Sequence, residues 1–205
     1  MAQPQVPPSI RTLYGTTYLQ TIGRPLEAAA ELERAVRDDP LSFAGRLQGA
    51  ICLFSAGMHA EVEAELRKLM EFENVYQSFY FLALNYASQG KTMEALDHAR
   101  QALALAPHNI HVRAVLAALS YRSGDSRLWE ELLNMLGDGR AFGAPVAMVL
   151  LHGLSDHFDE AVDWSEKIIE QRDPRVGSIY FPFLKPMRST SRWNRLMKLM
   201  NLVAS

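Results

Sequence analysis

Apolar residues recur at spacings of three and four along most of the chain, a pattern that predicts helices. The clearest stretch runs over residues 76–89, and its apolar positions fall on one face: Phe79, Leu82, Ala83 and Tyr86. Gly90 interrupts this stretch, and a second one follows over residues 92–106. No window shows the sustained alternation and hairpin turns that are typical of strands. The pattern therefore predicts an all-α fold in which a glycine ends the first helix of each hairpin.

This pair of helices is repeated along the chain. Four glycines stand in register at spacings of 34, 33 and 34 residues: Gly23, Gly57, Gly90 and Gly124. Positions five residues after each glycine share the period: Ala28, Val62, Ala95 and Trp129. So do positions twelve residues after: Ala35, Leu69, Ala102 and Leu136. Positions that share one period indicate an internal repeat of a helical hairpin.

The unit over residues 76–109 resembles the tetratricopeptide repeat. It carries the pattern of that family throughout: Phe79, Leu82, Ala83, Tyr86, Gly90, Ala95, Ala99, Ala102 and Pro107. The resemblance covers residues 9–174 and implies about five stacked hairpins. It also implies a right-handed superhelical solenoid with a concave inner face, because one hairpin cannot bury its apolar face alone.

The other units depart from the pattern at single positions. The first holds one extra residue before Gly23, and the second has Asn74 where the proline belongs. The fourth places Trp129 where a small residue is usual, so we expect its second helix to move outward or to change its packing partner. The fifth is marked mainly by residues 159–161 and 173–174.

The two ends differ from the repeats. Residues 1–8 are rich in proline and are expected to form a flexible leader. Residues 175–205 are expected to form a capping segment and a helix that begins near Thr190 or Ser191. The expected apolar face of that helix is Trp193, Leu196, Met197 and Met200, and the expected basic face is Arg192, Arg195 and Lys198. A cap over the last repeat is the main interpretation; a helix that binds a membrane or a partner is the alternative.

The tail also resembles a second pattern. Residues 186–193 match most positions of a proline-bracketed segment that ends the tetratricopeptide arrays of bacterial signalling proteins. Those proteins include serine/threonine kinases, winged-helix transcriptional activators and adenylate cyclases. The resemblance implies that the chain is the sensory or scaffolding part of a larger regulator.

Composition limits the classes of function. The 205 residues are 48% hydrophobic and 21% charged, with a formal net charge of −2, so no basic excess favours nucleic-acid binding. Cys52 stands alone, lies in an apolar stretch and is expected to be buried and inert. The N-terminus lacks the features of a signal peptide, and the longest apolar stretch, residues 144–154, is too short to span a membrane. We therefore expect a cytoplasmic protein without a membrane partner.

No catalytic constellation stands out. The chain has no phosphate-binding glycine loop and none of the signature motifs of kinases or serine hydrolases. A cluster near the fifth loop offers a remote metal hypothesis: His152, Asp156, His157 and Asp159. An ordinary polar turn is the favoured interpretation. We expect a protein that is not an enzyme and holds no cofactor or metal.

The family resemblance assigns residues of the first helices to the inner face, and these are the candidate partner-binding residues: Tyr14, Leu47, Gln48, Ile51, Phe54, Gln77, Tyr80, Phe81, Leu84, His111, Tyr121 and Arg122. Relatives that bind chaperone tails carry a lysine and an asparagine at two of these positions. Here the pairs are Leu47 with Ile51, Tyr80 with Leu84, and Ala114 with Ala118, so the resemblance implies a groove for apolar anchors. The alternative is burial between neighbouring first helices.

The sequence thus predicts a non-catalytic scaffold that binds a peptide or protein segment in its concave groove, in bacterial signalling or regulation. The alternative is a self-association domain of a larger signalling enzyme or transcriptional regulator, which would make the protein a homo-oligomer.

Overall fold

The computed structural model describes residues 6–73 and 75–202 of the chain. Within these residues the regular elements are helices and none is a strand, which confirms the predicted all-α class. Most of the predicted leader, and Asn74 of the second repeat, lie outside the described residues. The chain divides into two compact units, unit 1 (Met1–Asn74) and unit 2 (Val75–Ser205), and each is considered by itself.

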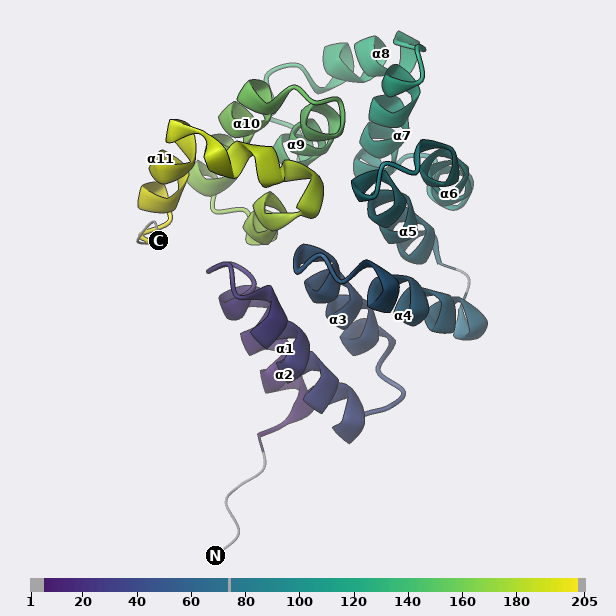
Figure 1. The fold of residues 1–205 in the computed structure, drawn as a ribbon, viewed down its shortest axis with the longest axis vertical. Helices are drawn as coiled ribbons and strands as arrows, with labels where there is room; N and C mark the ends of the chain where they lie inside the picture. Colours follow the sequence, from purple (N-terminus) through teal and green to yellow (C-terminus); the bar gives the residue numbers. More distant parts are fainter. Residues whose placement is uncertain (1–5, 74, 203–205) are drawn as a thin grey trace, which may run out of the picture. The chain divides into compact units, whose positions relative to one another are not determined.

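Unit 1 contains two helical hairpins (Figure 1). The first consists of α1 (Pro8–Leu13), η1 (Tyr14–Leu19) and α2 (Pro25–Asp38), and the second of α3 (Phe43–Ser55) and α4 (His59–Phe72). Helix α3 packs against both α2 and α4. The size of the α3 side chains therefore determines how fully the space between α2 and α4 is filled.

The extra residue of the first repeat is absorbed by a π-helix. η1 covers Tyr14–Leu19, and the Gln20 amide donates to the Gly15 carbonyl, five residues back, at 3.0 Å. A π-turn accommodates one residue more than an α-turn. The hydroxyl of Thr17 donates to the carbonyl of Leu13 at 2.6 Å, which gives that carbonyl an additional partner. The insertion therefore widens one turn and leaves Leu19 buried in the unit 1 core.

Unit 2 contains three further hairpins, formed by α5 (Tyr76–Ser88) with α6 (Thr92–Leu105), α7 (Ile110–Arg122) with α8 (Arg127–Leu136), and α9 (Ala144–Leu154) with α10 (Phe158–Glu170). Two 3-10 helices and a final helix follow: η2 (Pro174–Tyr180), η3 (Pro182–Ser189) and α11 (Ser191–Leu199). Helix α7 contacts α5 on one side and α9 on the other. The first helices of successive hairpins thus form one continuous face, which we call the first-helix face of unit 2.

The in-register glycines end the first helices as the sequence predicted. Gly23, Gly57, Gly90 and Gly124 have φ values of 77°, 77°, 74° and 93°. In each case the following residue donates its amide to the carbonyl five residues before it, as Lys91 does to Tyr86 at 3.0 Å. This is the Schellman pattern, which requires a left-handed residue after the helix. In the fifth hairpin, Asp156 takes the glycine's place with φ 62°.

The small residues of the repeat let the helices of a hairpin approach closely. Ala28, Ala95 and Ala102 are fully buried, as are the larger apolar residues Val62 and Leu82. A buried alanine carries no side chain beyond Cβ, so neighbouring helices can pack at short distance. The recurrence of these positions in the sequence is therefore a packing requirement of the hairpin.

Trp129 changes its packing partner, one of the two outcomes that the sequence allowed. Its ring lies 5.3 Å from Tyr121 on its own hairpin, and 5.8 Å from His152 and 5.5 Å from His157 on the next. The indole therefore joins two hairpins through aromatic contacts, where a small residue would pack inside one. Across residues 6–73 and 75–202, no helix has the length and apolar character of a membrane span.

Candidate partner-binding surfaces

The residues predicted for the inner face lie on first helices. In unit 1, Tyr14 belongs to η1, and the other four lie on α3: Leu47, Gln48, Ile51 and Phe54. Leu47 and Phe54 are buried in the core, whereas Gln48 and Ile51 are partly exposed. Tyr14 is 46% exposed and stacks on Tyr18 with ring centroids 5.4 Å apart. The unit 1 set thus contains two core residues, two partly exposed residues and the exposed Tyr14.

In unit 2, the chain itself covers part of the predicted face. Residues 174–189, which we call the cover segment, contact α5 and α9 of the first-helix face. Phe181 of this segment meets Phe81 edge to face, with ring centroids 6.4 Å apart. Leu84 is fully buried and Phe81 is buried, whereas Gln77 and Tyr80 keep partial exposure. The cover segment therefore contacts the predicted groove at Phe81, and Gln77 and Tyr80 stay partly exposed.

A charged clamp ties the start of the cover segment to α7. The Arg175 guanidinium donates to the Asp173 carboxylate, with Nε 2.8 Å from Oδ1, and its Nη1 lies 3.2 Å from Nε2 of His111. Since a guanidinium only donates, this contact favours a neutral His111 ring that accepts at Nε2. Nε2 also lies 3.2 Å from the Gly143 carbonyl oxygen, where the ring would have to donate, so the two contacts compete for one nitrogen.

The pKa values agree with a neutral ring in this clamp. Burial is the main cause that lowers the pKa of His111, and the adjacent Arg175 charge lowers it further. The hydrogen bond from Arg175 lowers the pKa of Asp173. The Arg175–Asp173 pair is partly buried, and its two parallel hydrogen bonds hold the guanidinium in one geometry. The clamp therefore fixes where the cover segment begins.

Helix α9 is shaped to receive the cover segment. Gly153 lies near its C-terminal end, and a Cβ atom there would lie 2.3 Å from the Leu184 side chain. Leu184 is fully buried. Burying a leucine side chain contributes about 1.5–3 kcal/mol. The missing side chain at Gly153 thus makes room for an apolar anchor of the cover segment.

Two basic residues of the final helix form surface ion pairs with α10. Arg195 pairs with Glu166 of α10 at 3.1 Å, and Arg192 pairs with Asp163 of the same helix. Leu196 and Met197 are buried. The helix begins after Thr190, in agreement with the predicted start. A membrane or partner helix would need a free basic face, and α10 already occupies two of its three cations.

The metal hypothesis for the fifth loop finds no support. Among the residues that the structure describes, no group of three or more histidine, cysteine or acidic side chains is placed to hold a metal ion. His152 and His157 instead contact the Trp129 ring, and the Tyr121 hydroxyl lies 3.5 Å from Nε2 of His157. Tyr121, a predicted groove residue, therefore belongs to an aromatic cluster between two hairpins.

Cys52 is buried in unit 1, as expected. Its thiol donates to Oε1 of Gln20 at 3.4 Å, and Nε2 of Gln20 donates to the Ser55 hydroxyl at 3.2 Å. Burial raises the pKa of the thiol to about 12. A thiol with such a pKa is protonated at neutral pH and is a poor nucleophile. The cysteine thus acts as a packing residue with a polar partner.

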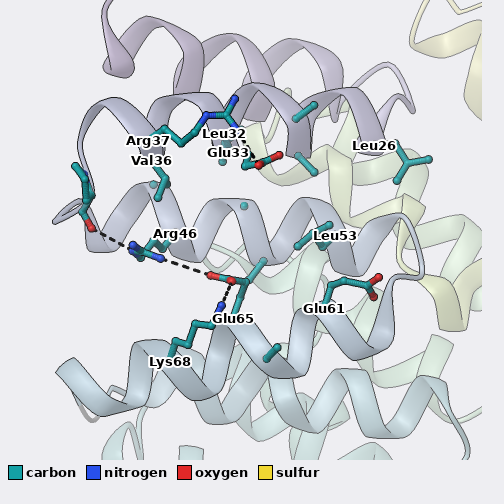
Figure 2. Close-up of a pocket in the computed structure, with 17 residues that line it drawn as sticks. Leu26, Leu32, Glu33, Val36, Arg37, Arg46, Leu53, Glu61, Glu65 and Lys68 are labelled. Atoms are coloured by element: carbon teal, nitrogen blue, oxygen red, sulfur yellow. Dashed lines mark hydrogen bonds and ion pairs between the residues drawn. The ribbon is translucent and has the colours of Figure 1, made fainter.

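The structure shows a second concave surface that the sequence interpretation did not include. A groove of about 860 Å³ runs between α2 and α4, with α3 as its floor (Figure 2). Its walls carry small and apolar side chains, among them Leu26, Ala29, Gly49 and Leu53. Three cations, Arg37, Arg46 and Lys68, lie toward one end in Figure 2, and Leu26, Leu53 and Glu61 toward the other. We call this surface the α2–α4 groove.

One repeat lacks a bulky side chain at the floor of the groove. Eight residues before the in-register glycine stand Leu82 and Leu116 in unit 2, but Gly49 in the second repeat. A Cβ atom at Gly49 would meet only the Leu32 side chain, at 3.8 Å. Aligning the repeats at this position is the sequence signal for the missing side chain.

Comparisons with known proteins support the fold. The structure is similar to the crystal structure of a tetratricopeptide repeat protein from Parabacteroides merdae, with a TM-score of 0.51 and 14% sequence identity. The match covers 97% of this chain and 81% of that chain. No protein-family model matches the chain, and no curated protein matches its sequence. The chain therefore has the all-α fold of tetratricopeptide-type helical hairpins.

Proposed function

We propose that the protein is a non-catalytic scaffold that binds a segment of a partner protein on its first helices. The observation that carries this proposal is the cover segment. Its aromatic and apolar side chains lie against α5 and α9 of the first-helix face. A face that holds one such segment within the chain has the chemistry to hold a similar segment from another protein.

The parts of the predicted groove that stay accessible are the places to look for that partner. Gln48, Gln77 and Tyr80 are partly exposed, and Arg122 is exposed. On unit 2, an apolar or aromatic partner segment with a polar edge would suit the surface around Gln77 and Tyr80. The non-catalytic part of the proposal draws on the fold that the chain shares with a tetratricopeptide repeat structure.

Site-specific photo-crosslinking tests the proposal. A crosslinking residue placed at Gln77 on the first-helix side is expected to capture a defined protein in the native cells. A matched residue at Glu94, exposed on the second helix α6, serves as the control. The variant Phe181→Ala, which loosens the cover segment, is expected to increase capture at Gln77. Equal capture from both positions, or substrate turnover that depends on this chain, would contradict the proposal.

Self-association is a second candidate, and one observation favours it. The first hairpin exposes a stripe of large apolar side chains on α1 and η1: Ile10, Leu13, Tyr14 and Tyr18, each 46–56% exposed. End repeats of a solenoid ordinarily present a polar outer face. Light scattering over a range of concentrations tests this candidate: a mass that rises with concentration, and falls in the variant Tyr14→Ser, supports it. A strict monomer excludes it.

We further propose a regulatory context, supported by the tail that resembles those of bacterial signalling arrays. Residues 186–193 of that tail span the end of η3 and the start of α11. The mass of the native gene product, measured by immunoblot in its own cells, tests this context. A product much heavier than 23.0 kDa supports a role within a larger regulator. A product of that mass supports a separate adaptor.

A further inference from the structure

We propose that the α2–α4 groove is a second binding surface, and that its occupant is an amphipathic helix with an acidic end from a partner protein. This surface lies between the second helices of unit 1, and the residues that α3 contributes to it are not those assigned to the inner face. The inference rests on the proposed function only in treating the protein as a scaffold. Four properties of the groove point to this occupant.

The first property is the missing volume at Gly49. The corresponding positions in unit 2 hold leucines, Leu82 at 0% and Leu116 at 7% exposure. Nothing but Leu32 lies within 4 Å of a Cβ atom built at Gly49. An apolar side chain from outside fills this space and removes apolar surface from water. The groove therefore favours a partner with a leucine-sized anchor.

The second property is the shape of the groove. Its lining along α2 runs from Leu26 to Arg37, which is about 17 Å at 1.5 Å per helical residue. A volume of about 860 Å³ over that length gives a cross-section of roughly 50 Å². A helix with side chains is about 10–12 Å in diameter, so the groove embeds one face of a helix of about three turns. The other face of such a helix stays in water.

The third property is the state of the backbone around the groove. Its walls are helices, whose amide and carbonyl groups bond to one another along the helix. An extended peptide laid in the groove would find few free backbone partners, and each unpaired buried group is costly. A helix satisfies its own backbone. This difference favours a helical occupant over an extended one.

The fourth property is the distribution of charge. Arg37, Arg46 and Lys68 lie toward one end, and the two nearby carboxylates are already shared (Figure 2). Glu33 pairs with Arg37 at 2.8 Å, and Glu65 pairs with Lys68 at 2.8 Å and with Arg46 at 3.7 Å. Three cations with two carboxylates leave a positive end. An acidic turn of the partner complements that end, and acidic residues in a first turn also stabilise the partner helix itself.

A designed probe tests the inference. The probe is a fluorescein-labelled peptide of about four helical turns, with leucines at i, i+4, i+7 and i+11 on an alanine and glutamine background and glutamates in the first turn. Fluorescence anisotropy measures its affinity for the full chain. We expect binding that weakens at least about tenfold in Gly49→Leu, because the new side chain occupies the anchor site. Replacing the peptide's glutamates with glutamine is expected to weaken binding roughly threefold or more.

Control variants separate the possible explanations. Ala104→Leu adds the same side chain at an exposed position of α6 and should leave binding unchanged. The double variant Arg46→Gln with Lys68→Gln tests the charged end without filling the groove, and should remove most of the preference for glutamate. Phe181→Ala, in the cover segment of unit 2, should have no effect on this probe.

Three results would overturn the inference. They are a lack of binding at millimolar peptide, equal binding to Gly49→Leu and the unaltered protein, and binding that follows Phe181 instead of Gly49. The third result would reject the groove and leave the proposed scaffold function intact. If the crosslinking experiment at Gln77 fails while the peptide binds the groove as expected, the proposed function on the first helices is rejected and the groove is retained.

Discussion

At the scale of single residues, five first helices end in the same way, with a left-handed residue that lets the next amide reach back. Glycine supplies that residue in four of them, and Asp156 in the fifth. A left-handed conformation costs an ordinary L-residue about 1–2 kcal/mol, and glycine almost nothing. The period of the four glycines predicts a left-handed turn at each of them. The sequence does not predict the same turn at Asp156, because aspartate also occurs in many other conformations.

Gly90 provides the clearest test of this turn. No atom lies within 4 Å of a Cβ built there, so a substitution acts on the backbone conformation alone. Gly90→Ala is expected to lower the free energy of unfolding by about 1 kcal/mol, and Gly90→Asn by less, since asparagine tolerates the left-handed region. Urea unfolding followed by circular dichroism measures both. Equal stability of alanine variant and parent would refute the explanation.

Asp156 gives the reverse experiment. Asp156→Gly relieves the left-handed aspartate, although the more flexible unfolded chain offsets part of the gain. The expected change lies between zero and about 1 kcal/mol of added stability. A clear loss of stability, in the same urea experiment, would mean that the aspartate side chain has a structural role of its own.

Two histidines, His152 buried and His111 partly buried, make the fold sensitive to acid. Burial lowers the pKa of His111 and of His152 below the ordinary value. In the unfolded chain both return to about 6.5, so below that pH the unfolded state binds protons that the folded state does not. Stability is therefore expected to fall as the pH drops through about 6.5, the pKa of the unfolded histidines. The variant His152→Phe keeps a ring beside Trp129 and should show a smaller fall; an identical fall would rule out a contribution from His152.

At the scale of elements, the π-helix η1 explains how the first repeat accommodates one extra residue. One extra residue precedes Gly23, and the wide turn absorbs it without displacing Leu19. Gly15 lets this turn approach α2, since a Cβ there would lie 2.3 Å from the Leu32 side chain. The period predicts that an insertion exists. Which turn widens depends on the local packing against α2.

Deleting one residue from η1 tests this account. Removing Thr17, which is exposed, should convert the wide turn to an α-turn and keep the fold, with a change in stability of about 1 kcal/mol or less. Removing Ala83 from α5, which has no extra residue, turns the following side chains away from the core and should prevent cooperative folding. Thermal melts by circular dichroism compare the two deletions. Similar damage from both would mean that η1 does not absorb an insertion.

The candidate surfaces show where sequence reasoning stops at this scale. Helical periodicity places Leu47, Tyr80 and His111 on first helices, and the structure agrees. It does not predict that residues 174–189 return to lie on α5 and α9, because this contact joins segments distant in the chain. Periodicity also does not predict the α2–α4 groove. The groove depends on the absence of a side chain at Gly49, where the equivalent positions of unit 2 carry Leu82 and Leu116.

At the scale of the whole molecule, the chain consists of two units with separate cores. Unit 1 buries Leu32 and Phe54, and unit 2 buries Leu82 and Leu150. Each unit therefore has the apolar interior that stability requires. The fold class and the repeat were predictable from the sequence, since both follow from local periodicity. Which surfaces stay accessible to a partner was not predictable, because this depends on which faces the chain itself covers.

The central claim is that the chain's own cover segment lies on the first-helix face of unit 2. The most direct measurement is the nuclear Overhauser effect between the ring protons of Phe81 and Phe181, whose centroids are 6.4 Å apart. We predict a cross-peak between these rings in the full chain, and its loss in Phe181→Ala. Absence of the cross-peak, with random-coil shifts for residues 174–189, would contradict the account, because the first-helix face would then be uncovered.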